Sequence, residues 1–253
     1  MGRGRIQYQR LLRTSLRLGV GALTLALPVG WLALQSPPPP TAVSAPVIDT
    51  TEVSVPAMRT AVFGKEPASP EVRHVANWAV FTGDHKKMSF VIVDKKAAKV
   101  FIFNPQGELL AATPALLGSA RGDDTVPGIG DRPLSQVLPS ERTTPAGRFI
   151  AEPGINTHGE DIVWVDYDAA VSLHRVRTNN KSERRLERLA SPTADDNRIS
   201  FGCINLPVSF YESVLSPTVR STGAIIYVLP ETRTPAEVFG SFDVQVVAQH
   251  ARR

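Results

Sequence analysis

The residue with the clearest chemical potential is Cys203, the single cysteine among 253 residues. A thiol attacks carbonyl carbons as a thiolate, which requires a depressed pKa or a neighbouring base. Gly202 precedes it, and a glycine beside a nucleophile lets the backbone approach a substrate closely. Consecutive amides in such a turn can form an anion-binding concavity that suits a developing oxyanion. The pattern predicts a nucleophilic thiol, with an inert buried thiol as the alternative.

A nucleophilic thiol needs a base, and the sequence offers five histidines: His74, His85, His158, His174 and His250. His174 is the first candidate, because it ends a strand-like apolar run that starts at Ala169, and strand ends commonly present an imidazole to a site. His158, in a turn-like segment, is the second. For any single histidine, a surface or core role is the alternative. Zinc held by His158, His174 and Cys203 is chemically reasonable, but no short ligand spacing supports a metal site.

The N-terminus is typical of an export signal. Five arginines precede the apolar run Leu18 to Leu34, and residues 1–45 contain no Asp or Glu. As a helix this run would span about 25 Å, slightly less than the hydrocarbon core of a bilayer. Small residues at 43–45 suit a signal peptidase, whereas Pro46 hinders cleavage. We predict a signal peptide or signal anchor over 1–35 and a Pro-rich linker over 36–70, with the remainder exported to the periplasm. A retained anchor would make the inner membrane a partner.

The charge balance gives no reason to expect nucleic acid as a partner. The formal net charge is +4, but removing the five N-terminal arginines leaves 23 basic against 24 acidic residues. The positive excess therefore belongs to the export signal. Export also makes a lone cysteine unusual, since exported domains use cysteines in pairs. This strengthens the case for a chemical role of Cys203.

Short apolar or alternating runs separated by turn residues predict a mainly β fold with a few helices, either a β-sandwich or an open barrel. The expected strands cover residues 89–94, 98–104, 108–118, 147–151, 161–165, 169–176 and 222–229. The expected helices cover residues 71–81, 182–189 and 207–215. The loop from Ser119 to Thr144 is rich in Gly, Pro and Asp, and loops of that length are often functional.

The segment Ser200 to Asn205 (SFGCIN) resembles the [S/T]-H-G-C-hydrophobic-[N/R] signature of L,D-transpeptidase (YkuD-like) catalytic domains. Thr144 to Phe149 (TPAGRF) is similar to the T-P-x-G-x-F strand of that family. Leu173-His174 resembles the strand end that carries its catalytic histidine, and Ser89 to Phe103 resembles its opening hairpin. The resemblance places a catalytic domain at 71–231, with a core of about 87–229, and a C-terminal extension at 232–253.

The resemblance implies the fold of that catalytic domain and a cysteine acyl transfer without cofactor or metal. Cys203, activated by His174, would attack the carbonyl after the L-centre of a diamino acid in a peptidoglycan tetrapeptide stem, and D-alanine would leave. The acceptor would be an amine from a second stem, a lipoprotein lysine or a free D-amino acid. Gly202, with the Cys203 amide, would hold the oxyanion, and the carbonyl of Arg175 would orient the imidazole. Substrate-binding candidates are Ser200, Asn205, Arg177 and Arg198.

Several features depart from the family pattern. Phe201 stands where a second histidine is usual, and Arg175 where Gly or Ser is usual. The 25 residues between His174 and Ser200 also exceed the usual span. The charged stretch Lys181 to Arg188 fills this excess as a lid or as a solvated helix, and we favour the solvated helix. Two alternatives stay open: an L,D-carboxypeptidase that uses water as acceptor, and a non-catalytic module that binds peptidoglycan.

Overall fold

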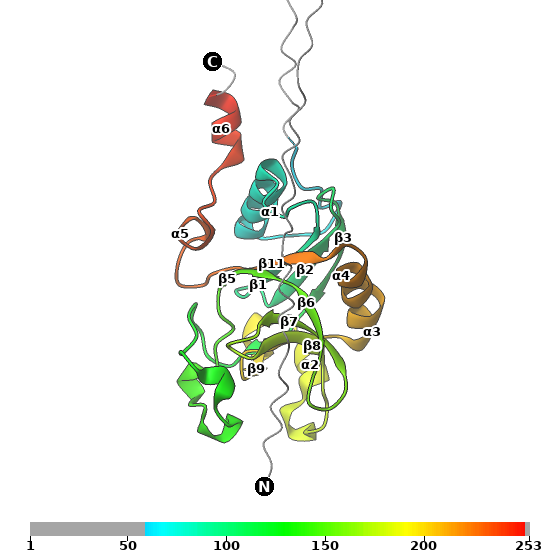
Figure 1. Cartoon of the computed structure of the whole chain (residues 1–253), viewed down its shortest axis with the longest axis vertical. Helices are drawn as coiled ribbons and strands as arrows, with labels where there is room; N and C mark the ends of the chain where they lie inside the picture. The colour runs from blue at the N-terminus through cyan, green and yellow to red at the C-terminus, as the bar shows by residue number, and fades with distance from the viewer. Residues whose placement is uncertain (1–58, 251–253) are drawn as a thin grey trace, which may run out of the picture. The chain divides into compact units, whose positions relative to one another are not determined.

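The computed structural model describes residues 59–250, whose elements form three layers (Figure 1). Helix α1 (Pro70–Thr82) lies on one face of a five-stranded sheet, and a four-stranded sheet faces the other side. The five-stranded sheet has the order β3-β2-β1-β11-β5 and is formed by β1 (Ser89–Asp94), β2 (Lys99–Phe103), β3 (Leu109–Pro114), β5 (Gly147–Ile150) and β11 (Ala224–Val228). The described chain is mainly β with a few helices, as predicted.

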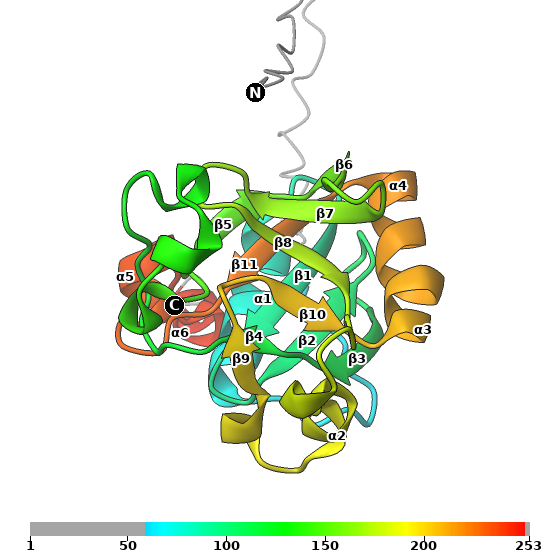
Figure 2. The same cartoon turned by 90° about the horizontal axis from the view of Figure 1, so that it is seen from below.

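The four-stranded sheet carries the elements around Cys203 and has the order β10-β8-β7-β6. Its strands are β6 (Glu152–Ile155), β7 (Asp161–Asp166), β8 (Val171–Arg175) and β10 (Ile204–Leu206). A small third pairing joins β4 (Leu117–Gly118) to β9 (Arg198–Ser200). Figure 2 shows β8, β9 and β10 on the face opposite α1. Within residues 59–250 no sheet closes into a barrel, which agrees with the predicted mainly β fold of a sandwich or open barrel.

The remaining helices are short. They are α2 (Arg185–Ala190), α3 (Val208–Phe210), α4 (Ser216–Thr222), α5 (Pro235–Phe239) and α6 (Val244–His250). Single 3-10 turns cover Ile129–Asp131, Leu134–Gln136, Pro139–Glu141, Lys181–Glu183 and Ala194–Asn197, and a π-helical turn covers Tyr211–Leu215. None of the helices within 59–250 is long and apolar enough to cross a membrane. The predicted signal segment, 1–35, lies outside the described residues.

The strand β1 is apolar on both of its faces because both faces are buried. Phe90 and Ile92 are buried against α1, whereas Val91 and Val93 are buried between the two sheets. Successive side chains of a strand point to opposite faces, so a strand covered on both faces shows no polar positions. Ser69 is the N-cap residue of α1, and its hydroxyl accepts from the amide of Val72. This hydroxyl caps the first turn of the helix.

Several predicted elements are divided or extended. The expected strand 108–118 divides into β3 and β4, and the expected helix 182–189 is interrupted at Arg184, whose φ is 50°. The expected helix 207–215 continues to Thr222. Pro217 lacks the amide that an α-helical ladder needs, and just before it the amide of Ser216 donates to the carbonyl of Tyr211 in a π-turn. The apolar pattern of the sequence therefore did not predict that the helix continues past Ser216.

A buried ammonium group joins the β1–β2 turn to the long loop. Lys95 is fully buried, and its Nζ donates to Asp123 Oδ1 at 2.9 Å and to the carbonyl of Thr144 at 2.9 Å. It also donates to the carbonyl of Gly122 at 2.5 Å. Both ends of the loop Ser119 to Thr144 are thus held at one point. A buried charge is tolerated only when it is paired and fully hydrogen-bonded.

We expect Lys95→Ala to lower the free energy of unfolding by about 3 to 5 kcal/mol, because Asp123 would keep a buried charge without its closest ionic partner. Chemical denaturation measures this loss. Lys96→Ala is the matched control, since the Lys96 side chain is 50% exposed in its pair with Glu71, and it should change the free energy by roughly 0.5 kcal/mol or less. Equal losses of unfolding free energy in the two variants would contradict a stabilising role for the buried ammonium of Lys95.

Candidate active site

Cys203 lies in a tight turn between β9 and β10, and this turn is built from hydrogen bonds at both ends. The amide of Ser119 donates to the carbonyl of Ser200 at 2.9 Å. Leu116 exchanges two backbone hydrogen bonds with Asn205, each 2.9 Å long. The segment between β3 and the long loop therefore holds both flanks of the turn. These backbone contacts fix the turn that carries the thiol, and the thiol itself donates to the carbonyl of Ala170 at 3.5 Å.

Gly202 has a structural reason to be glycine. Its φ is 133°, and a Cβ there would lie 2.7 Å from the carbonyl oxygen of Thr143. Its amide donates to Ser200 Oγ at 3.1 Å, and Ser200 Oγ donates to the carbonyl of Cys203 at 2.6 Å. The Gly202 amide is thus engaged inside the turn, and this differs from its predicted part in an oxyanion hole. Of the two predicted donors, the Cys203 amide remains.

The imidazole of His174 is oriented by its neighbour along the chain. Its Nδ1 lies 2.7 Å from the carbonyl oxygen of Arg175, which can only accept, so Nδ1 carries the proton. The side chain of Arg175 points elsewhere and pairs with Asp161 at 2.8 Å and Glu212 at 2.9 Å. The carbonyl of Arg175 is therefore placed as expected, although the residue type departs from the family pattern.

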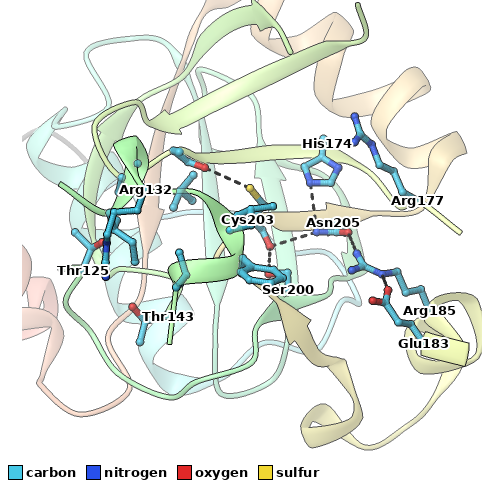
Figure 3. Close-up of a pocket in the computed structure, with 18 of the residues that line it drawn as sticks. Thr125, Arg132, Thr143, His174, Arg177, Glu183, Arg185, Ser200, Cys203 and Asn205 are labelled. Atoms are coloured by element: carbon cyan, nitrogen blue, oxygen red, sulfur yellow. Dashed lines mark hydrogen bonds and ion pairs between the residues drawn. The ribbon is translucent and has the colours of Figure 1, made fainter. Parts of the chain in front are cut away.

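The parallel pairing of β8 with β10 sets Asn205 opposite His174. Asn205 Nδ2 lies 3.5 Å from His174 Nε2 and donates to the carbonyl of Cys203 at 3.3 Å. Ser172, also on β8, places its hydroxyl 3.7 Å from the Cys203 Sγ. Figure 3 shows the thiol, the imidazole and the Asn205 amide around one cavity.

Burial raises the pKa of the Cys203 thiol, but hydrogen bonding to His174, the charge of His174, and the amide and hydroxyl of Ser172 outweigh it. The pKa of this thiol therefore lies below its ordinary value. A lower thiol pKa raises the thiolate fraction at neutral pH, which is what a nucleophile requires. The half-buried thiol lines the cavity and is accessible from it.

The cavity has a volume of about 390 Å³ and two walls of different origin. One wall comes from the long loop and includes Arg132 and Leu134, and the other comes from the segment after β8 and includes Arg177, Glu183 and Arg185. Figure 3 shows Arg132 on one side of Cys203 and Arg177 and Arg185 on the other. The charged stretch is therefore part of the cavity wall, which differs from the solvated helix that we favoured.

The predicted site residues separate into two groups. Cys203, His174, Ser200, Asn205 and Arg177 all line the cavity. Arg198 does not line it, because its side chain is buried and pairs with Glu231 at 2.6 Å. Its predicted contact with substrate therefore has no support in the geometry. An arginine beside a candidate nucleophile in sequence carries no signal that distinguishes a buried ion pair from a substrate contact.

His158, the second candidate base, is exposed in the β6–β7 turn and does not line the cavity. Its Nδ1 lies 3.3 Å from the hydroxyl of Thr157. The zinc alternative needs His158 beside His174 and Cys203, and the fold keeps it apart. Among residues 59–250, no three His, Cys, Asp or Glu side chains are arranged to hold a metal ion.

Phe201 and three charged residues that line the cavity, Arg132, Glu183 and Arg185, had no role predicted from the sequence, and neither had Arg142 behind Phe201. The Phe201 ring is 38% exposed in the cavity, and the guanidinium of Arg142 stacks over it at 4.1 Å. Arg132, Arg142, Glu183 and Arg185 carried no motif. Arg132 has an ion pair with Glu141 at 3.1 Å, and its Nε and Nη2 have no hydrogen-bond partner among the described residues.

No family model matches the sequence, and no curated protein matches it. Among solved structures, the chain is similar to the NMR structure of the catalytic domain of an Enterococcus faecium L,D-transpeptidase, with 16% identity over 56% of this chain and 98% of that one at a TM-score of 0.34. It is also similar to the helical cell shape determining protein Pgp2 of Campylobacter jejuni, with 12% identity over 58% of this chain and 49% of that one at a TM-score of 0.38. It spans about half of the latter. The first belongs to the family that the sequence motifs resemble.

We expect iodoacetamide to alkylate Cys203 with a pH midpoint below the value of about 8.5 of a free cysteine. His174→Gln should move this midpoint to higher pH, because the imidazole lowers the pKa of the thiol. Intact-mass spectrometry across a pH series measures both. His158→Gln is the control and should leave the midpoint unchanged. The pairing of the Cys203 thiol with the His174 imidazole would be refuted by an alkylation midpoint that is the same in His174→Gln as in the wild-type protein. A wild-type midpoint at or above that of free cysteine would also refute it.

Proposed function

We propose that this chain is an exported cysteine acyltransferase of the L,D-transpeptidase type, acting on peptidoglycan stem peptides. The observation that carries the proposal is the arrangement around one cavity of the Cys203 thiol, the His174 imidazole and the Arg175 carbonyl that orients it. The motif around Cys203 supports the same chemistry. A nucleophile, its base and a group that orients the base form the arrangement that covalent acyl transfer requires.

In the proposed first half-reaction, Nε2 of His174 accepts the thiol proton and Sγ attacks the carbonyl carbon of a tetrapeptide stem. A carbon–sulfur bond forms, and the carbonyl oxygen becomes an oxyanion near the amide of Cys203. The tetrahedral intermediate then collapses and its carbon–nitrogen bond breaks. The imidazolium gives its proton to the amine of the departing D-alanine, and a thioester remains on Cys203.

In the second half-reaction, an amine attacks the thioester, gives up a proton to His174, and expels the sulfur, which recovers the thiol. A second stem peptide or a lipoprotein lysine would supply this amine in the wall, and a free D-amino acid could also do so. Water as acceptor would make the chain an L,D-carboxypeptidase. The chemistry needs no cofactor. The N-terminal segment 1–35 would deliver the domain to the periplasm and, if retained, hold it at the inner membrane.

The cavity wall fits a substrate that carries carboxylates. Arg177 lines it and forms an exposed ion pair with Glu160, which a substrate carboxylate can replace. The guanidinium group binds carboxylates with two parallel hydrogen bonds and is therefore suited to this task. On the opposite wall, Arg132 adds positive charge. We assign carboxylate binding to Arg177 in place of Arg198.

Incubation with a purified tetrapeptide stem should give a thioester on Cys203 and release D-alanine. Cys203→Ala should remove the adduct and lower turnover by about a thousandfold or more, since no other thiol exists in the chain. Intact-mass spectrometry reports the adduct, and chromatography of the products separates crosslinked from trimmed stems. A carbapenem serves as a second acylating probe.

A Cys203→Ala protein that still forms crosslinks or trims stems would refute the proposal. Wild-type protein that is folded and binds muropeptides but forms no adduct with either probe would instead identify a non-catalytic binding module. Circular dichroism of each protein excludes misfolding as the reason for a missing adduct.

We expect Arg177→Met to raise the KM for the tetrapeptide roughly tenfold with a smaller change in kcat, because a charge-assisted contact with bound substrate is lost. Steady-state kinetics measures the split. Arg198→Met is the contrasting variant, and it should lower the unfolding midpoint instead, since it leaves Glu231 buried without its closest partner. The reverse assignment of the two effects would contradict the placement of these arginines.

A further inference from the structure

We propose that Arg185, from the charged segment between β8 and β9, is a positioning residue that fixes the amide of Asn205 and thereby keeps Nε2 of His174 free as a proton acceptor. This inference rests on the proposed function for its biological meaning, but its geometry stands apart from any substrate. Arg185 lies outside all the motifs that the sequence offered. It reaches the site only because the fold turns its segment against β10.

The contact between Arg185 and Asn205 is short and sheltered. Arg185 Nη1 donates to Asn205 Oδ1 at 2.6 Å, and the Arg185 side chain is only 15% exposed. Glu183 accepts from Arg185 Nε at 2.5 Å and holds the guanidinium from its other edge. Arg188 in turn donates to the carbonyl of Glu183 at 2.8 Å. The guanidinium is therefore held in place, and Figure 3 shows it beside the Asn205 amide.

Two neighbours of opposite character determine which way the amide faces. A guanidinium has donors only, so it must meet the amide oxygen of Asn205. The carbonyl of Cys203 accepts only, so the amide nitrogen must face it, and the two atoms lie 3.3 Å apart. Both contacts require the same orientation. The amide NH₂ then also faces His174 Nε2, at 3.5 Å, the outer limit of a hydrogen bond.

This orientation has a consequence for the imidazole. Nδ1 of His174 carries a proton, because it donates to the carbonyl of Arg175. An NH₂ group facing Nε2 favours a lone pair there and disfavours a second proton. Nε2 of His174 therefore presents a lone pair that is placed to accept the thiol proton. An amide turned by 180° would present its oxygen to Nε2, favour a proton there, and stabilise an imidazolium beside a thiolate.

Charged groups from three elements face this pair. Arg177 follows β8, Glu183 and Arg185 lie on the segment before and at the start of α2, and Arg132 lies on the opposite loop. Removing Arg185 alone would change the local charge as well as the amide. Removing Glu183 and Arg185 together deletes one charge of each sign, so that the effect of the amide is isolated from the loss of charge.

The test compares Glu183→Gln/Arg185→Met with Arg184→Met/Glu187→Gln. The second pair lies on the same segment, is exposed at 69% and 61%, and makes no contact with Asn205. We expect the first double variant to move the pH midpoint of Cys203 alkylation by iodoacetamide downward by about 0.5 unit or more, because the amide then keeps only its 3.3 Å contact with the Cys203 carbonyl and can turn its oxygen towards the imidazolium. The control should keep the wild-type midpoint.

A downward shift that is absent from the control supports the positioning role, and its absence or an upward shift overturns it. If the first variant does not fold, ¹⁵N spectra of the imidazole in the wild-type protein decide. A neutral His174 with its proton on Nδ1 is expected, and a proton on Nε2 overturns the inference. Neither iodoacetamide alkylation nor NMR needs peptidoglycan, so the positioning role of Arg185 can be tested even if the acyl-transfer proposal fails. Acyl transfer can likewise be tested if the positioning role fails.

Discussion

The buried ammonium group of Lys95 is the constraint on which the geometry of the cavity depends. It binds the carbonyls of Gly122 and Thr144, which lie at the two ends of the long loop, and it pairs with Asp123. A donor-only group in a dry interior must be surrounded by acceptors, so the loop ends have one arrangement that satisfies it. Burial lowers the pKa of the Lys95 ammonium, while its hydrogen bond and charge interaction with Asp123 act in the opposite direction.

The constraint extends from Lys95 to the thiol in short steps. Thr144, whose carbonyl meets the ammonium, donates through its hydroxyl to the carbonyl of Gly202 at 2.8 Å. Gly202 precedes Cys203 and completes the turn that presents the thiol. On the other side, Asp123 accepts from the amides of Glu231, Thr232 and Arg233. One ion pair therefore connects the central sheet, the loop wall, the turn that carries Cys203 and the start of the C-terminal segment.

Three features that differ from the family signature lie around Cys203 and His174. Arg175 contributes its carbonyl to His174, while its side chain is drawn to Asp161 and stacks over Tyr211 at 4.4 Å. At position 201 the apolar ring of Phe201 stands where the family signature has a histidine, and the guanidinium of Arg142 packs over this ring. The extra residues between β8 and β9 include Arg185, whose guanidinium donates to the amide oxygen of Asn205. The guanidinium groups of Arg142 and Arg185 thus contact the segment around Cys203 from outside its motif.

Most of the framework could be predicted from the sequence, because long apolar runs and capped helices have a local cause. The strands β1 and β11 and the helix α1 follow from apolar runs. The three-residue strands β9 and β10 could not be predicted, because three residues show no periodicity. They exist because Leu116, Ser119 and β8 offer them hydrogen-bonding partners. Such partners are invisible in the local sequence.

The sequence by itself singled out Cys203 and His174, since a lone thiol in a chain that is predicted to be exported and a histidine at the end of a strand both favour a chemical role. Only the tertiary structure decided which charged residues surround them. Arg177, Arg185 and Arg198 look alike in sequence, yet Arg177 and Arg185 line the cavity while Arg198 joins a buried ion pair. The physical reason is that the role of an arginine depends on which acceptors the fold brings within hydrogen-bonding distance, and those acceptors lie tens of residues away along the chain.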